Sequence, residues 1–142
     1  MDIQPTLIRG DFFSDDRGKL SFINNFLMSQ VKRMYMVEHP DPTVIRAWQA
    51  HKREQKWFYV LDGAFLVKLI KIDNWEMPFK AEDCIEFNLS RMDNTILHVP
   101  GGYANGFKGL FENSRLLVFS DLDIKEAAED NMKFRVDYWN CW

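Results

Sequence analysis

The chain has 142 residues, of which 46% are hydrophobic and 15% aromatic, so it can bury a sizeable core. Its formal net charge is −3, and Lys and Arg are scattered rather than clustered, which argues against a nucleic-acid or anionic-membrane surface. The longest apolar runs, such as WFYVL, are too short to span a bilayer. We therefore expect one domain over residues 1–142 that binds neither nucleic acid nor membrane.

The start of the chain, MDIQPTLIRGDFF, lacks a basic segment followed by an apolar one, so no signal peptide is expected. Cys84 and Cys141 are far apart in sequence and form no CxxC pair. Two free thiols in a cytoplasmic protein are the simplest interpretation of both observations.

Most of the chain is predicted to form short strands. Residues 31–39 alternate in a period of two, which indicates a strand. Residues 56–61 and 64–72 are two apolar runs joined at Asp62-Gly63, a strong hairpin signal. Three further short runs, rich in β-branched or aromatic residues, follow at 84–89, 95–100 and 114–121.

Only residues 123–132, DIKEAAEDNM, are predicted to be helical, because they contain good helix formers and neither Gly nor Pro. Many short strands with little helix predict an all-β, single-domain jelly-roll barrel with a short helix near the C-terminus. A jelly roll leaves sheet edges unpaired, so we expect a homodimer.

Two segments have the frame of the cupin metal motifs. The first motif, His-x-His, a later acidic ligand and a hairpin Gly, is represented by Gln49-Ala50-His51, Gln55 and Gly63. The second, Pro-x-Gly followed by a His, is represented by residues 100–105, which end at Asn105. The chain therefore resembles a cupin, but His51 is its only strong ligand in these motifs. Amide oxygens are weak neutral ligands, so we expect no metal and no other cofactor.

Four segments, in order, resemble a narrower group of cupins: Asp16-Arg17-Gly18, residues 31–35, residues 46–52 (RAWQAHK) and residues 100–107 (PGGYANGF). This group comprises the dTDP-4-dehydrorhamnose 3,5-epimerases and the dTDP-4-keto-6-deoxyhexose 3,4-ketoisomerases. The resemblance extends from about residue 10 to residue 121. It implies a metal-free dimeric jelly roll that acts on a nucleotide-linked deoxysugar, in bacterial surface-polysaccharide biosynthesis.

The departures from this pattern affect the acid–base residues. Gln49 and Asn105 stand where the epimerases have histidines, and residues 116–119 (LLVF) lack the epimerase tyrosine. Gln and Asn cannot accept a proton at neutral pH, so ordinary 3,5-epimerisation is disfavoured. His51 remains as the sole candidate base, although a histidine on a strand can equally well be a satisfied core or rim residue. One imidazole within reach of two adjacent carbons can move a keto group from C4 to C3, which favours a ketoisomerase.

The resemblance also suggests roles for the other candidate residues. Lys56 would polarise the keto oxygen or bind phosphate, although a solvated lysine at a strand start is nearly as good an interpretation. Arg46 would contact the diphosphate, because a guanidinium offers forked donors. Since Arg46 lies five positions before His51, the two share a strand face only if a bulge intervenes. Arg17 would reach the nucleotide of the partner subunit. The remaining substrate-binding candidates are Gln49, Tyr103 and Asn105, whereas Phe107 is assigned to the core.

Two other functions stay open at this point. The missing histidines and tyrosine also fit a binding module that keeps the pocket without the chemistry. A divergent cupin for an unrelated small molecule is the third possibility. The aromatic tail at residues 134–142 could close the barrel, stack on a base or form a dimer surface.

Overall fold

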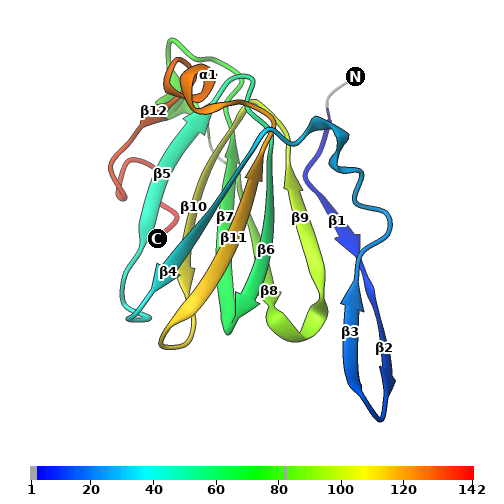
Figure 1. Cartoon of the computed structure of the whole chain (residues 1–142). Coiled ribbons are helices and arrows are strands. Elements are labelled where there is room, and N and C mark those ends of the chain that lie inside the picture. The colour runs from blue at the N-terminus through cyan, green and yellow to red at the C-terminus, as the bar shows by residue number, and fades with distance from the viewer. Residues whose placement is uncertain (1–2, 82) are drawn as a thin grey trace.

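The computed structural model describes residues 3–81 and 83–142 as an almost entirely β structure with one short helix near the C-terminus. Two five-stranded antiparallel sheets face each other, and a separate two-stranded hairpin extends from one side (Figure 1). The prediction of an all-β jelly roll with a short C-terminal helix is confirmed.

The sheets are built from strands that are distant in sequence. The first sheet runs, in spatial order, β1 (Thr6–Arg9), β9 (Thr95–Val99), β6 (Lys56–Asp62), β11 (Ser114–Ser120) and β4 (Arg33–His39). The second runs β12 (Met132–Lys133), β5 (Arg46–His51), β10 (Tyr103–Gly109), β7 (Ala64–Lys71) and β8 (Cys84–Ser90). The hairpin consists of β2 (Asp11–Asp15) and β3 (Gly18–Phe22). Three 3-10 turns lie between strands, at Met28–Gln30, Pro78–Lys80 and Arg91–Asp93.

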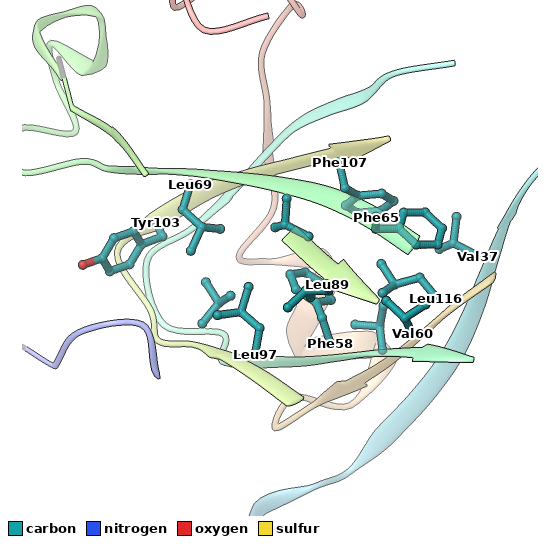
Figure 2. Close-up of a cluster of buried hydrophobic side chains, with 13 residues drawn as sticks. Val37, Phe58, Val60, Phe65, Leu69, Leu89, Leu97, Tyr103, Phe107 and Leu116 are labelled. Atoms are coloured by element: carbon teal, nitrogen blue, oxygen red, sulfur yellow. The ribbon is translucent and has the colours of Figure 1, made fainter. Parts of the chain in front are cut away.

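The main core lies between the two sheets, where alternate residues of each strand point inward. Its buried side chains come from β4, β6, β7, β8, β9, β10 and β11 (Figure 2). Phe107 belongs to this core, with 6% of its surface exposed, as the sequence predicts. Phe58 and Phe65 make edge-to-face contacts with it.

The β6–β7 hairpin turns at Asp62-Gly63, as predicted, and Gly63 has a φ of 72°. A positive φ at this turn explains why glycine is the residue found there.

The helix α1 (Ile124–Ala128) is shorter than the predicted 123–132. Asp123 caps its first turn through a capping box with Glu126. The chain then leaves the helix because Asp130 binds the loop after His51 and Met132 pairs with β5. Tertiary contacts therefore override the helix propensity of residues 129–132.

The aromatic tail covers the outer face of the second sheet. Trp139 packs edge-to-face on Trp48 with ring centroids 5.3 Å apart, and Trp48 Nε1 donates to the carbonyl of Val136 at 3.1 Å. Cys84 and Cys141 pack against the same apolar cluster and are free cysteines. Within the described residues, no helix is long and apolar enough to cross a membrane.

Candidate functional site

A cavity of about 340 Å³ opens between β4 and β5. Helix α1 lies over the C-terminal end of β5 (Figure 1) and contributes Ile124, Ala127 and Ala128 to the cavity wall. The polar part of the lining includes three basic residues, Arg33, Arg46 and Lys56, together with Gln49, His51 and Glu54. The cavity therefore combines a basic wall with a single imidazole.

A β-bulge brings Arg46 to this cavity. Asn105 on β10 pairs with Gln49, but the next residue, Gly106, pairs with Ala47, so Trp48 is an extra residue in β5. Because of this extra residue, Arg46 lies on the same face of β5 as Gln49 and His51, and all three line the cavity. The bulge that the sequence analysis required for a shared face is present.

His51 is buried, with 4% of its surface exposed, and its two ring nitrogens have different surroundings. Nδ1 lies 2.7 Å from the carbonyl oxygen of Asp130. Because a carbonyl only accepts hydrogen bonds, Nδ1 carries the proton and Nε2 is left with a lone pair. Nε2 is buried and has no hydrogen-bond partner among the described residues. This is the tautomer that a general base at Nε2 requires.

Burial lowers the pKa of His51, and the positive charge of Lys56 lowers it further, whereas Asp130 and Glu54 oppose the change. The imidazole therefore stays neutral, and able to accept a proton, at neutral pH.

Glu54 is a site residue that the sequence analysis missed. Its carboxylate is 1% exposed, and Oε1 lies 3.3 Å from Nδ1 of His51. Oε2 accepts hydrogen bonds from Arg33 at 2.8 Å and from Ser120 at 2.5 Å. The motif spacing predicts the acidic cupin ligand at position 55, but the side chain of Gln55 binds Asp121 and His98 outside this cavity. The available signal was an acidic residue three positions after the histidine.

Asp130 connects the loop after His51 to the segment after α1. Its carboxylate accepts the backbone N–H groups of Lys52, Arg53 and Glu54 at 2.9, 2.8 and 2.7 Å. Burial raises the pKa of Asp130, but these three hydrogen bonds outweigh it and the net pKa is lowered. The loop that carries Glu54 is thus held by an ionised carboxylate.

Lys56 is 3% exposed, and its ammonium makes no hydrogen bond or ion pair with the residues that the structure describes. It lies 5.9 Å from the centre of the Tyr35 ring, and the guanidinium carbon of Arg33 lies 5.2 Å from the same ring. Tyr35 also lines the cavity, a position that the sequence analysis did not assign. An ammonium that reaches the cavity without an anionic partner among the described residues is suited to an oxygen of a bound ligand.

Of the other predicted residues, Gln49 and Asn105 lie together. Asn105 lines an adjoining cavity of about 240 Å³, shared with Arg46 and Gln49, and donates to the Gln49 carbonyl at 3.3 Å. Tyr103 stands opposite His51 on β10, but its ring packs at one end of the core and does not line the His51 cavity (Figure 2).

Arg17 is not brought to the cavity by its own chain. It lies at the tip of the β2–β3 hairpin, which Figure 1 shows pointing away from α1. There its side chain is 82% exposed and forms an ion pair with Asp15 at 2.6 Å.

The part of the chain that the structure describes holds no group of three or more His, Cys, Asp or Glu residues arranged to bind a metal ion. The expectation of a metal-free protein stays a prediction.

No protein-family model and no curated protein matches this sequence. Solved structures do match in fold. The QdtA 3,4-ketoisomerase from Thermoanaerobacterium thermosaccharolyticum, a double mutant in complex with TDP, is 20% identical, with a TM-score of 0.74 over 99% of this chain and 94% of that one. Another variant of QdtA is in complex with TDP-4-keto-6-deoxyglucose.

Two further structures extend the comparison. The WlaRB TDP-quinovose 3,4-ketoisomerase from Campylobacter jejuni is 19% identical, with a TM-score of 0.70 over 94% of this chain and 95% of that one. The dTDP-4-dehydrorhamnose 3,5-epimerase from Bacillus anthracis, with TDP and PPi bound, is also 19% identical, with a TM-score of 0.75 over 94% of this chain and 79% of that one. The chain thus has the cupin-like fold shared by the dTDP-sugar 3,4-ketoisomerases and 3,5-epimerases.

Proposed function

We propose that this chain is a metal-independent isomerase of a nucleotide-linked deoxysugar, in which His51 moves the keto group of a dTDP-4-keto-6-deoxyhexose from C4 to C3. The observation that carries the proposal is the buried, unpaired Nε2 of His51, in a cavity that Lys56 also lines. The TDP and the TDP-4-keto-6-deoxyglucose bound to QdtA support this choice of ligand.

The reaction needs only one base. Nε2 of His51 removes the proton from C3, and the electrons of the C3–H bond form a C3=C4 enediolate with the negative charge on O4. Lys56 stabilises that oxygen through its positive charge in a buried site. The same imidazole then returns the proton to C4, while the hydroxyl proton of O3 moves to O4 and C3 becomes the carbonyl carbon. Atoms and charges balance without a further reactant.

Arg46, on the basic wall of the cavity, is the proposed contact of the diphosphate. Arg46 is exposed at the start of β5 and offers a forked donor, the geometry that phosphate oxygens accept. Gln49 and Asn105 act as hydrogen-bonding partners of the sugar hydroxyls, not as bases. Tyr103 is left out of this proposal because its ring belongs to the core.

The proposed active form is a homodimer in the cytoplasm, with Arg17 serving the partner's site. The β2–β3 hairpin pairs with no other strand of the described chain and exposes Phe13 and Leu20. Strand β4 ends the first sheet and exposes Met34 and Met36, at 62% and 51%. These apolar surfaces suit a second copy of the chain. The proposed setting is the biosynthesis of a bacterial surface polysaccharide.

The test is to incubate the protein with dTDP-4-keto-6-deoxyglucose in D2O and to follow the sugar protons by NMR. We expect the keto group to move and deuterium to enter at C3 or C4. His51→Asn should reduce turnover by at least about 10²-fold, whereas His98→Asn, outside the cavity, should not. Unchanged turnover in a folded His51→Asn protein would refute the role of His51.

A second function, binding without catalysis, is favoured by one feature of the site. Gln49 and Asn105 cannot transfer protons, and the inward positions of β11 are Leu116 and Val118, so no tyrosine acid enters from that strand. In the same experiment, line broadening of the nucleotide without deuterium exchange would support the binding module. Absence of any interaction would favour an unrelated small molecule.

A further inference from the structure

Glu54 occupies an unusual position for a carboxylate. Its side chain is 1% exposed, and its two oxygens have separate partners. Oε2 accepts from Arg33 and Ser120, at 2.8 and 2.5 Å, whereas Oε1 faces Nδ1 of His51 at 3.3 Å. An ionised carboxylate survives burial when it is paired and hydrogen-bonded in this way.

We propose that Glu54 is a positioning residue for His51: its Oε1 supports the Nδ1–H tautomer that the carbonyl of Asp130 selects, and its charge stabilises the protonated imidazole. The inference rests on the proposed role of His51 as a base. Arg33 and Ser120 hold Glu54 in place, because both donate hydrogen bonds to Oε2 and leave Oε1 facing the imidazole.

The charges around His51 explain why such a partner is needed. The ring is buried, and Lys56 on β6 places a positive charge near it. When Nε2 accepts a proton from a substrate, the ring becomes a second cation in the same buried space. The groups that oppose this cost are the carboxylate of Glu54, the carbonyl of Asp130 and the more distant carboxylate of Asp130. Glu54 is the one whose carboxylate faces Nδ1.

Arg33 sets the strength of this effect. Its guanidinium binds Oε2 of Glu54 and also donates to the carbonyl of Leu122 at 3.3 Å, just before α1. The negative charge of Glu54 is therefore divided between two partners, the guanidinium of Arg33 and the imidazole of His51. Removing Arg33 should make Glu54 a stronger partner of the imidazole, and removing the charge of Glu54 should have the opposite effect.

The experiment is an NMR titration of the His51 ring signals in the full-length protein, assigned by their loss in His51→Asn. Glu54→Gln should move the His51 titration to lower pH by about one unit or more, and Arg33→Gln should move it to higher pH. Glu129→Gln, which removes an exposed charge from the segment after α1, is the matched control and should leave the titration in place.

Turnover provides the second measurement. If Glu54 acts through His51, Glu54→Gln should lower kcat by about 10²-fold or more with little change in KM. A folded Glu54→Gln protein with an unmoved His51 titration would overturn the inference. If that variant does not fold, an unmoved titration in Arg33→Gln would overturn it equally. The titration needs no substrate, so a protein without isomerase activity but with shifted titrations would refute the proposed reaction and leave the pairing of Glu54 with His51 intact.

Discussion

Asp130 binds the His51 region through both its backbone and its side chain. Its carbonyl oxygen accepts the Nδ1 proton of His51 at 2.7 Å, and its carboxylate accepts three consecutive N–H groups of the loop that follows His51. The residue that orients the imidazole therefore also holds the loop that carries Glu54. The segment after α1 and the end of β5 form one structural unit at the cavity.

Asp130→Asn should destabilise the protein by about 1–3 kcal/mol. Three backbone N–H groups bind the two carboxylate oxygens of Asp130, whereas an amide offers only one acceptor oxygen. Urea unfolding at pH 7 measures the loss, with Asp137→Asn on the exposed tail as the control. The folded-state pKa of Asp130 is lowered, so its stabilisation is present above its ordinary value of 3.8 and is lost as the pH falls through the lowered value. The difference between wild type and variant should therefore shrink on acidification. A gap that stays constant down to the acid limit would contradict this account.

The proposed isomerase activity of the wild-type protein should persist below pH 6.5, the ordinary pKa of histidine. Burial and then Lys56 lower the pKa of His51, so the imidazole remains an unprotonated base at pH values where an exposed histidine is half charged. The acid limb of kcat/KM against pH, measured with dTDP-4-keto-6-deoxyglucose, should have its midpoint below 6.5. A midpoint above 6.5 would mean that another group, or a differently placed His51, controls the rate.

Lys56→Met should move that acid limb to higher pH, because the variant removes the positive charge that lowers the pKa of His51. It should also reduce kcat, since the oxygen of the proposed enediolate would lose its cationic partner. The control is Lys133→Met, which removes a charge from the adjoining cavity without touching the His51 pocket. A large loss of kcat with no movement of the acid limb would separate the two roles assigned to Lys56.

The sequence predicts the strands, the β6–β7 hairpin and the placement of Phe107 in the core, because each depends on local pattern: alternation, a turn dipeptide or an aromatic in a strand. It also predicts that Arg46 needs a bulge, but not that one exists. The bulge depends on the pairing of β5 with β10, which no local pattern specifies.

Two site residues, Glu54 and Asp130, could not be predicted from the sequence because their roles depend on contacts with distant parts of the chain. Glu54 differs from its neighbour Gln55 by one position, and the turn of the loop after β5 decides which side chain enters the cavity. The helix predicted for residues 123–132 includes Asp130, whereas in the structure its partners are residues 51–54. Such roles depend on contacts between segments that lie about 80 residues apart in sequence, and local propensity does not specify these contacts.

Met36→Glu should convert the proposed dimer into a monomer, because it places a charge in the exposed apolar face of the edge strand β4. Light scattering after size-exclusion chromatography should give twice the chain mass for the wild type and one chain mass for the variant. Met92→Glu, at a methionine that is 76% exposed outside this face, should remain dimeric. A monomeric wild type would refute the dimer, and a dimeric Met36→Glu protein would place the interface elsewhere.

Gly63→Ala should destabilise the protein more than Gly18→Ala, although both glycines have a positive φ, 72° and 129°. A Cβ at Gly63 would lie 2.3 Å from Oγ of Ser114, whereas a Cβ at Gly18 would meet nothing within 4 Å. Gly63→Ala therefore incurs about 1–2 kcal/mol of left-handed backbone strain together with an overpacking cost of about 1–3 kcal/mol. Gly18→Ala incurs backbone strain alone, of about 1–3 kcal/mol, because a φ of 129° lies beyond the left-handed helical region. Urea unfolding of the two variants measures the difference. If the clash is real, adding Ser114→Gly to Gly63→Ala should recover part of the stability that Gly63→Ala alone loses. Equal losses for the two single variants would mean that Ser114 moves aside freely, and Ser114→Gly would then recover no stability.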